Sequence, residues 1–392
     1  MTAATTAATT GLKLSVVGTS LLENERRVPI HPWHFERIPA ELRARMTFEE
    51  GYGAPFGIPD GRLQELFGGV AARDELLAGD GVVLLPKMQA ADLALVREGG
   101  VVWGWPHCVQ QTDVTQLAID RRLTLIAWEA MFTWRRDGSH EMHLFYRNNE
   151  MAGYCAVMHA MALAGRDGGR YGPPLRAVVL SFGSVSRGAV HALRGQGVAD
   201  ITVYTQRPVW SVHDRVPGCR YGQMLVPDDG SPIEVLDGDG RTRRLVDVLA
   251  RRDLIVNGIL QDTDKPLMFL TADDVGRLRE GAMIVDVSCD LGMGFSFARP
   301  TSFQEPTFQV GPMTYYAVDH TPSYLWRSAS YELSEVVMAF LADVAGGPEA
   351  WATNETLQRA IEIRNGEVQN PRILSFQQRA PAWPHEQRPD DA

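Results

Sequence analysis

The sequence predicts an α/β protein with two Rossmann-like domains, each built on a parallel sheet. Short apolar runs alternate with helical segments along most of the chain, which is typical of a parallel sheet covered by helices on both faces. Near the middle, residues 177–190 have the pattern of a strand, a glycine turn and a helix. With 392 residues, the chain is long enough for two or three domains of roughly 150 residues each.

The composition is that of an ordinary globular protein, with 45% hydrophobic and 22% charged residues. A net charge of −10 argues against a nucleic-acid partner, because such a partner requires a basic face. The chain has no run of about 18 apolar residues, so we expect no membrane span. The leading segment MTAATTAATT lacks the charged and apolar regions of a signal peptide, and we expect it to be disordered.

The cysteines lie far apart and form no C-x-x-C pair; they are Cys108, Cys155, Cys219 and Cys289. This spacing fits neither a zinc site nor a disulfide framework, so we expect no bound metal. It favours the reducing cytoplasm as the location of the protein.

The first strand–helix series fills the N-terminal part of the chain. Apolar runs of strand type occupy residues 12–17, 81–88, 99–105 and 123–132. Residues 148–165 then carry apolar groups at helical spacing, with Asn148 as the expected N-cap. We expect this long helix to join the two domains.

The second series follows the loop at residues 166–175. Its expected strands occupy residues 176–182, 201–205, 253–259, 282–288 and 315–319. Residues 328–345 and 354–365 predict two amphipathic helices, and we expect the end of the chain from residue 378 to be mobile.

The turn near the middle of the chain has the outline of a dinucleotide-binding fingerprint. Ser181, Gly183 and Ser186 hold its three small-residue positions, with Ser184 and Val185 between the last two. In such a turn the central glycine lets the backbone approach a pyrophosphate, and the helix N-terminus supplies N–H groups. Because serine replaces the first and third glycines, an ordinary strand–helix turn stays open as an alternative.

The end of the next strand indicates which dinucleotide would bind. An NAD site carries an acidic residue there, about 20 residues on, which binds the ribose 2′-hydroxyl. This chain has Thr205 instead, followed by Arg207. An acid would repel a 2′-phosphate and an arginine can bind it, so the sequence favours NADP(H) over NAD. The alternative is that Arg207 is simply an exposed loop residue, in which case NAD stays open.

Six short stretches carry a resemblance to a known family. They are residues 23–32 (ENERRVPIHP), 49–60 (EEGYGAPFGIPD), 83–88 (VLLPKM), 104–109 (GWPHCV), 152–157 (AGYCAV) and 317–334 (AVDHTPSYLWRSASYELS). Together, from about residue 12 to residue 340, they resemble the alanine dehydrogenase superfamily. Within it the chain looks closest to the carboxyethylornithine synthases and the lysine-forming saccharopine dehydrogenases.

The resemblance implies a discontinuous substrate domain and an inserted cofactor domain. Residues 1–147 and the C-terminal helices at 320–392 would form the first, and residues 148–319 the NAD(P)-binding Rossmann domain, with the active site in the cleft between them. Family members join or split an amino acid and a 2-oxo acid at a secondary amine, or aminate a 2-oxo acid with ammonia. We therefore expect a 2-oxo acid and an amino acid as substrates, and a homo-oligomer.

Three residues match the family's substrate and catalytic positions. Arg27 would hold the oxo acid's carboxylate with its bidentate fork, although a loop salt bridge is the alternative. Lys87 follows an apolar strand, so its ammonium would lie at the carboxyl end of the sheet, where such sheets place ligands. His107 would share the proton transfers with Lys87, because imidazole is the usual acid–base group near neutral pH. Outside the family match, Lys87 could merely end a strand and His107 could be a structural hydrogen bonder.

Four further residues are carried over from the family. Glu129 matches an acidic residue near the substrate amine and would bind the ammonium of the amino acid, unless it pairs with an arginine. Asp290 aligns with an aspartate near the nicotinamide in alanine dehydrogenases. Asp319 and His320 align with the cofactor-side pair of saccharopine dehydrogenases. Aspartates at strand ends can also be structural caps.

These residues predict a cytoplasmic, NADP-preferring oxidoreductase of the opine type. It would reduce the imine between a small 2-oxo acid and an amino acid's side-chain amine, or run that reaction backwards. Two alternatives stay open: an amino acid dehydrogenase that releases ammonia, and a catalytically silent nucleotide-binding protein. Ser181 in place of a glycine favours the silent protein, whereas Arg27, Lys87 and His107 together argue against it.

Overall fold

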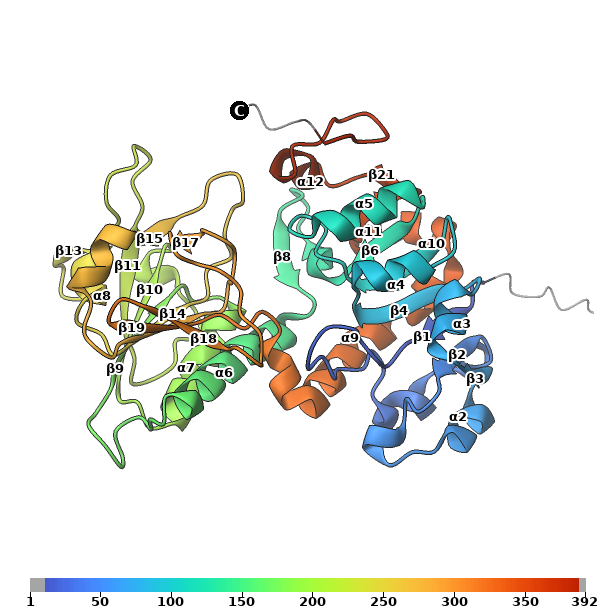
Figure 1. Ribbon diagram of the computed structural model, residues 1–392, viewed down its shortest axis with the longest axis horizontal. Coiled ribbons are helices and arrows are strands. Elements are labelled where there is room, and N and C mark those ends of the chain that lie inside the picture. The colour runs from blue at the N-terminus through green and yellow to red at the C-terminus, as the bar shows by residue number, and fades with distance from the viewer. Residues whose placement is uncertain (1–10, 388–392) are drawn as a thin grey trace, which may run out of the picture. The chain divides into compact units, whose positions relative to one another are not determined.

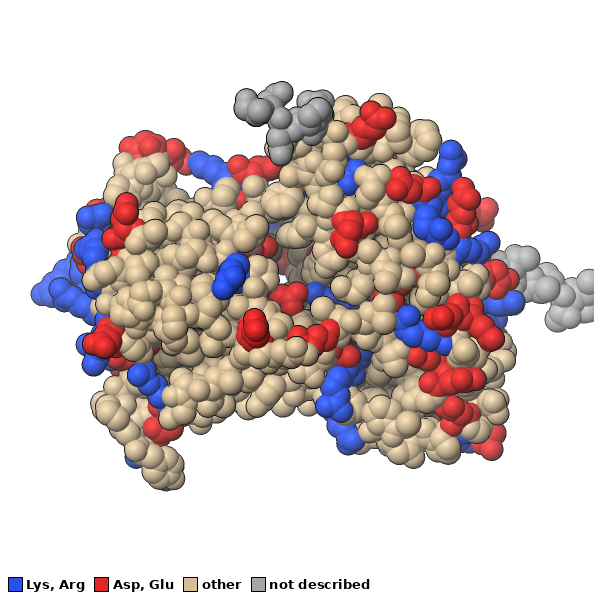
Figure 2. Space-filling model, in the orientation of Figure 1, with Lys and Arg blue, Asp and Glu red and all other residues tan. Residues whose placement is uncertain are grey.

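The computed structural model describes residues 11–387, which form two compact units (Figure 1). Unit 1 holds the described residues up to Phe145 and from Trp326 onward, and unit 2 holds Tyr146–Leu325. The expected N-terminal lead, residues 1–10, lies outside the described residues. In Figure 2, acidic and basic side chains are interspersed over the visible face of each unit. None of the described helices is both long and apolar enough to cross a bilayer.

Unit 1 is built on an eight-stranded sheet in the order β21-β20-β6-β5-β4-β1-β2-β3. Its strands are β1 (Leu14–Val16), β2 (Met46–Glu49), β3 (Gly69–Ala71), β4 (Val82–Lys87), β5 (Val101–Trp105), β6 (Thr124–Ala127), β20 (Ile361–Arg364) and β21 (Glu367–Val368). The strands from β6 to β3 pair in parallel, and β20 is antiparallel to both of its neighbours. A separate hairpin joins β7 (Phe132–Trp134) to β8 (His140–His143).

The helices of unit 1 surround this sheet. The α-helices are α1 (Ala40–Arg43), α2 (Asp60–Leu66), α3 (Arg73–Ala78), α4 (Ala90–Leu95), α5 (Thr112–Asp120), α9 (Trp326–Gly346), α10 (Pro348–Thr353), α11 (Glu355–Ala360) and α12 (Pro371–Phe376). Short 3-10 helices are η1 (Pro32–Arg37), η2 (Ala54–Phe56) and η3 (Trp128–Ala130). In α9, Leu333, Val337 and Leu341 are buried at intervals of one turn, so one face of this helix packs on the same core as β1 and β4.

Unit 2 is built on a nine-stranded sheet in the order β13-β12-β11-β10-β9-β14-β16-β19-β18. Its strands are β9 (Arg176–Leu180), β10 (Asp200–Thr205), β11 (Arg220–Leu225), β12 (Glu234–Leu236), β13 (Thr242–Arg244), β14 (Leu254–Asn257), β16 (Met283–Asp286), β18 (Thr307–Val310) and β19 (Met313–Tyr316). The strands from β11 to β19 are parallel, and antiparallel strands close both edges. The two-domain α/β prediction is therefore confirmed, with antiparallel edges added to the parallel sheets.

The remaining elements of unit 2 are mostly helices. They are α6 (Tyr146–Leu163), α7 (Ser184–Gly195), α8 (Leu245–Leu249), η4 (Val209–Ser211), η5 (Ala272–Arg277), η6 (Thr321–Leu325) and the strand pair β15 (Met268–Leu270) and β17 (Gly294–Phe295). The expected second boundary, at residue 320, differs from the unit boundary because η6 packs with α6. Thr321 Oγ1 donates to the carbonyl oxygen of Ala152 at 2.8 Å, which holds η6 in unit 2.

Helices α6 and α7 lie side by side and touch through their backbones (Figure 1). A Cβ atom added to Gly153 of α6 would lie 1.8 Å from the carbonyl oxygen of Val185, and one added to Gly188 of α7 would lie 1.7 Å from that of Glu150. Only glycine allows this approach. The contact positions the N-terminus of α7, which begins directly after the glycine turn.

Two sequence predictions about unit 1 were wrong in part. Residues 123–132 form no single strand, because β6 ends at Ala127 and η3 follows. Residues 354–365 form no single helix either: α11 ends at Ala360, and the run 361–364 pairs with β6 as β20. The segment IEIR alternates β-branched and charged residues, which suits a strand once a partner strand is available.

Two further differences concern the ends of elements. Asn148 is not the N-cap of α6, because the helix begins two residues earlier and Asn148 is buried within its first turn. Residues 378–387, which the sequence placed in a mobile end, pack on unit 1 through the buried side chains of Arg379 and His385. Residues 388–392 lie outside the described residues.

Candidate active site

The candidate substrate and catalytic residues of unit 1 follow neighbouring parallel strands. Arg27 lies in the loop after β1, and Lys87 is the last residue of β4. His107 comes two residues after β5, and Glu129 lies in η3, which follows β6. Since these strands are adjacent in the order β6-β5-β4-β1, their carboxyl ends share the sheet edge at which open α/β sheets bind ligands.

Arg27 is buried and oriented by an acidic neighbour. Its side chain is 2% exposed, and its Nε and Nη2 donate to Oε1 and Oε2 of Glu25 at 2.8 and 2.5 Å. Its guanidinium also lies over the ring of Trp105, 4.8 Å from the centroid. The backbone N–H of Val28 donates to Oγ of Ser330 at 2.9 Å, which ties this loop to α9. The guanidinium is therefore held in one place before any substrate binds.

Lys87 lies at the middle of the same edge. The residue is 6% exposed, and it stands opposite Trp105 in the β4–β5 register. Its carbonyl oxygen accepts a hydrogen bond from Oγ of Ser20 at 3.0 Å. The loop after β1 is thus joined to the end of β4, and Arg27 belongs to that loop.

His107 adopts the left-handed backbone conformation, with φ of 48°. Its N–H donates to Oε1 of Glu129 at 2.7 Å, and its Nδ1 lies 3.9 Å from the same oxygen. Its side chain is 33% exposed. The imidazole and the carboxyl therefore form one polar group at the edge of the sheet, with the ring accessible from solvent.

Glu129 is the most perturbed acid of this site. Burial, reinforced by the negative charge of Glu362, raises the pKa of Glu129 to about 8, although the Lys87 ammonium and the N–H of His107 oppose the rise. Its Oε2 is buried and accepts no hydrogen bond. Protonation of this carboxyl is therefore favoured near neutral pH, while its side chain as a whole is 26% exposed.

In unit 2, the glycine turn has the geometry of a phosphate cradle. Ser181 is left-handed with φ of 82°, and its Oγ accepts from the N–H of Gly183 at 3.3 Å. Ser186 Oγ donates to the carbonyl oxygen of Leu180 at 3.0 Å, so this side chain is turned into the protein. A Cβ added to Gly183 would meet only Ser181 Oγ, 3.9 Å away, so the space in front of this glycine is open. The turn and the twelve-residue helix α7 thus fit a pyrophosphate.

Arg207 is anchored beside this turn. Its Nη2 donates to the carbonyl oxygen of Phe182 at 3.0 Å, and its N–H donates to Oγ1 of the buried Thr205 at 3.3 Å. The side chain itself is exposed. A cationic group therefore lies between the glycine turn and the end of β10.

The three remaining cofactor-side candidates follow β16 and β19, which are neighbours in the sheet. Asp290 comes four residues after the end of β16. Asp319 and His320 follow β19 and pair through Oδ1 and Nδ1, with Asp319 40% and His320 3% exposed. All three belong to the carboxyl edge of unit 2, the same edge as the glycine turn.

Comparisons with known proteins identify the family to which this chain belongs. The N-terminal domain model of the alanine dehydrogenase/PNT family matches residues 20–152, and the C-terminal domain model of that family matches residues 224–371. The chain belongs to the alanine dehydrogenase/PNT family. The C-terminal match begins after the glycine turn, where Ser181 and Ser186 replace glycines.

Family members of two activities resemble this chain at low identity. An N(5)-(carboxyethyl)ornithine synthase of Clostridium botulinum is 24% identical, over 80% of this chain and 88% of that protein. An alanine dehydrogenase of Mycobacterium tuberculosis is also 24% identical, over 92% of this chain and 95% of that protein. A solved L-alanine dehydrogenase has a TM-score of 0.70 at 19% identity, covering 93% of this chain and 99% of that one. A transhydrogenase of Sinorhizobium meliloti has a TM-score of 0.65 at 18% identity, covering 91% of this chain and 99% of that one.

The family establishes the class of enzyme. The predicted NAD(P)-dependent oxidoreductase acting on CH–NH donors is confirmed, as is the predicted superfamily. The similar proteins include both N(5)-(carboxyethyl)ornithine synthases and alanine dehydrogenases, so membership of the alanine dehydrogenase/PNT family is compatible with either activity.

In this family member, three further residues near the candidates could not be recognised from the sequence. His143 accepts from the N–H of Phe145 at Nδ1 and lies 3.2 Å from the carbonyl oxygen of Glu129 at Nε2; burial lowers its pKa to about 4, so it is a neutral donor to η3. Glu362 was hidden inside the expected helix 354–365. In unit 2, Asp286 accepts from Asn257 at 2.9 Å, and burial raises its pKa to about 6.

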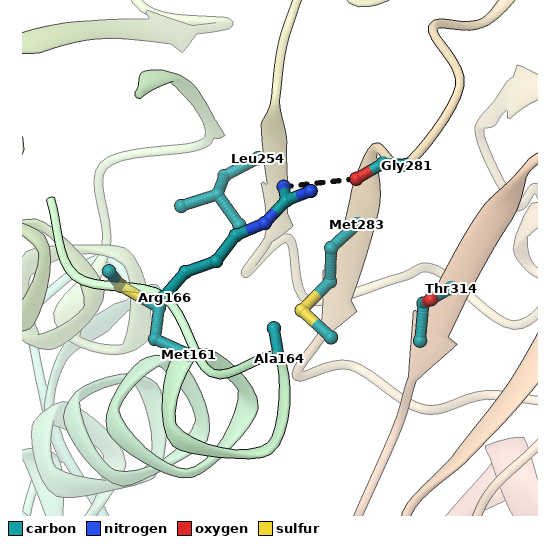
Figure 3. A pocket seen from close by; sticks show the side chains of 7 residues that line it. All are labelled: Met161, Ala164, Arg166, Leu254, Gly281, Met283 and Thr314. Atoms are coloured by element: carbon teal, nitrogen blue, oxygen red, sulfur yellow. Dashed lines mark hydrogen bonds between the residues drawn. The ribbon is translucent and has the colours of Figure 1, made fainter. Parts of the chain in front are cut away.

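A cavity of about 150 Å³ in unit 2 lies at the amino-terminal edge of its sheet, opposite the edge that carries the glycine turn (Figure 3). It is lined by Met161, Ala164, Arg166, Leu254, Gly281, Met283 and Thr314. The Arg166 side chain extends toward Gly281, and its Nη1 donates to the carbonyl oxygen of that glycine at 3.0 Å. Because β14 and β16 begin at this edge, the cavity is remote from the carboxyl ends where such sheets bind dinucleotides.

Proposed function

We propose that this enzyme prefers NADP(H) and forms or cleaves a secondary amine between a small 2-oxo acid and an amino acid's side-chain amine. The observation that carries the proposal is the carboxyl of Glu129, which lies beside His107 at the sheet edge and is partly exposed, with 26% of its side chain accessible. An enzyme that uses ammonia needs no group to hold a second amino acid. One that joins two amino-acid-like substrates must also bind the charged end of the second.

The orientation of Arg27 is consistent with its proposed role in binding the carboxylate of the oxo acid. Its Nε and Nη2 both donate to Glu25, which orients the planar guanidinium fork. A substrate carboxylate would bind at the end of the fork, with Glu25 fixing the plane of the guanidinium. This would place the carbonyl of the oxo acid near Lys87 and His107, which belong to the same edge of the sheet.

Lys87 and His107 would carry the proton transfers. The amine nitrogen attacks the carbonyl carbon and loses protons, and the carbonyl oxygen gains protons and leaves as water, which yields the imine. The dihydronicotinamide, when bound, would supply the hydride for the imine carbon, and Lys87 or His107 would supply the proton that the nitrogen needs to become a secondary amine. A base and an acid are needed close together, and an ammonium and an imidazole at one sheet edge meet that need.

Glu129 would bind the α-ammonium of the amino acid. Burial and the charge of Glu362 raise its pKa to about 8, which favours the protonated carboxyl near pH 7. Binding of a cation favours the ionised form, so the carboxyl would release its proton as the amino acid enters. The affinity for the amino acid should therefore rise as the pH is raised toward 8, because the ionised fraction of Glu129 grows over that range.

A comparison of amine donors tests the proposed reaction. NADPH oxidation would be followed with pyruvate, glyoxylate or 2-oxoglutarate, with ammonia, ornithine or lysine as the amine donor. We expect a basic amino acid to support faster turnover than ammonia. Turnover with ammonia alone would replace the proposal by the alanine dehydrogenase type of reaction. Absence of turnover with every pair would favour a silent nucleotide-binding protein.

The variant Glu129→Gln should weaken binding of the amino acid more than that of the oxo acid. A hydrogen bond to a charged group contributes about 1.5–3 kcal/mol, so we expect the KM of the amino acid to rise about tenfold or more. The dependence of this KM on pH below 8 should also disappear. Glu141→Gln, which alters an exposed glutamate of β8, is the matched control. Equal changes in the two KM values would argue that Glu129 is structural.

The NADP preference is supported by Arg207 beside the glycine turn. Binding of NADPH should be tighter than that of NADH. In Arg207→Ala, the ratio of the NADH and NADPH dissociation constants should fall by about tenfold or more, because one charge-assisted contact to the 2′-phosphate is lost. Titration of both cofactors by protein fluorescence would measure this. Arg251→Ala, at the opposite edge of the sheet, should leave the ratio unchanged. Equal affinities of the unmodified protein for the two cofactors would contradict the preference.

A further inference from the structure

The turn that carries His107 requires support from outside itself. A residue other than glycine in the left-handed region is strained, and such a conformation persists only where its surroundings hold it. The carbonyl oxygen of His107 accepts from the N–H groups of Gln110 and Gln111 at 3.1 and 2.9 Å, which closes the turn. The carbonyl oxygens of Cys108 and Val109 are left to find donors elsewhere.

Gln377, about 270 residues further along the chain, supplies them. It follows α12, is 7% exposed, and donates from Nε2 to the carbonyl oxygens of Cys108 and Val109 at 2.6 and 3.2 Å. Thr115 of α5 donates to the same Cys108 oxygen at 2.7 Å, and its Oγ1 lies 3.4 Å from Nε2 of Gln377. The two carbonyls directly after His107 are therefore bound by a side chain of the C-terminal segment.

The orientation of this amide is determined by its other partner. Arg379 donates from Nε to Oε1 of Gln377 at 2.7 Å. A guanidinium can only donate and a carbonyl can only accept, so only one orientation of the Gln377 amide satisfies both sides. Arg379 is itself 3% exposed, and its Nη1 donates to Oε1 of Gln116 at 2.8 Å and to the carbonyl oxygen of His385 at 3.2 Å. The amide is thus locked from both ends.

We propose that Gln377 is a positioning residue for His107, and that Arg379 acts by fixing the Gln377 amide. Through the carbonyls of Cys108 and Val109, the pair holds the turn in which His107 adopts its left-handed conformation. The imidazole is then kept beside Glu129. This inference rests on the proposed role of His107 in proton transfer.

Gln377→Met preserves the shape of the side chain and removes both its donor and its acceptor. With NADPH, pyruvate and ornithine, we expect kcat to fall about 10- to 100-fold, because a small displacement of a catalytic group has effects of that size. The Kd of NADPH should be unchanged, since the cofactor turn belongs to unit 2. Gln378→Met, the same change at the exposed neighbouring residue, is the matched control and should retain full activity.

A double-mutant cycle separates positioning from general stability. If Gln377 acts through His107, Gln377→Met should cause no further loss of kcat in a His107→Gln background. Likewise, the losses of kcat caused by Arg379→Met and by Gln377→Met should not be additive in the double variant. A further loss in the His107→Gln background, of the size seen in the unmodified enzyme, would overturn the proposal and leave Gln377 a purely structural residue.

A second readout requires no substrate. Hydrogen–deuterium exchange at residues 107–111 should accelerate about tenfold in Gln377→Met, with exchange in β9 unchanged. Unchanged exchange in the turn would overturn the inference whatever the assay shows. If His107→Gln keeps full activity, the proposed role of His107 fails and the inference falls with it. If His107→Gln is inactive and Gln377→Met is fully active, the inference fails alone. Should Gln377→Met not fold, Gln377→Asn, which keeps the amide but cannot span both partners, should give the same pattern.

Discussion

Lys87→Met and His107→Gln should each lower kcat by about 10²–10⁴-fold, with the Kd of NADPH little changed. The expected loss is large because each replacement removes a group that exchanges a proton with the reacting atoms. Methionine replaces most of the apolar stem of Lys87 at the buried end of β4 without its ammonium, and glutamine keeps hydrogen-bonding capacity at position 107. Cofactor binding should be spared because the glycine turn and Arg207 belong to unit 2.

Turnover would be measured by NADPH oxidation with the best oxo acid and amine pair found in the donor comparison, and cofactor binding by fluorescence titration. Lys13→Met is the matched control for Lys87, because Lys13 lies on the surface and forms an exposed ion pair with Asp80. The control should retain full activity, since exposed pairs contribute little. A variant at position 87 or 107 that kept near-normal turnover would lose its assigned catalytic role.

Gly188→Ala should strongly destabilise unit 2. The added Cβ would lie 1.7 Å from the carbonyl oxygen of Glu150, so α6 and α7 would have to separate. Overpacking usually costs about 1–3 kcal/mol and occasionally more. Here we expect at least the upper end of that range, because the clash is with backbone and no side chain can move aside. The same shift would displace the N-terminus of α7, so NADPH binding should also be lost.

Gly195→Ala is the matched control in the same helix. A Cβ at Gly195 meets no atom within 4 Å, so this variant should be stabilised by about 0.5–1 kcal/mol through the lower flexibility of alanine. Urea unfolding of both variants, followed by circular dichroism, would measure the difference. Equal stability of Gly188→Ala and Gly195→Ala would contradict the close contact of α6 and α7.

The sequence by itself determined the strands that carry the site. Lys87 ends β4 and His107 follows β5, as predicted, because a run of apolar residues followed by a polar one reports where a buried strand leaves the core. Adjacent parallel strands present their ends at one edge, so the proximity of these residues could also be expected. Arg27 and Glu129 became candidates through the resemblance to the family, although the overall identity to its members is low.

The tertiary structure decided the partners of these residues. The sequence predicted a helix over residues 354–365, and only the pairing of 361–364 with β6 places Glu362 where its charge raises the pKa of Glu129. Gln377 had no local signal either, because its partners lie about 270 residues earlier. The spacing of apolar residues along a segment indicates only whether that segment buries one face as a helix or as a strand. Which distant side chain meets a given carbonyl or carboxyl is settled by how strands and loops pack, and short apolar runs such as 361–364 become strands only when a neighbouring strand offers its edge.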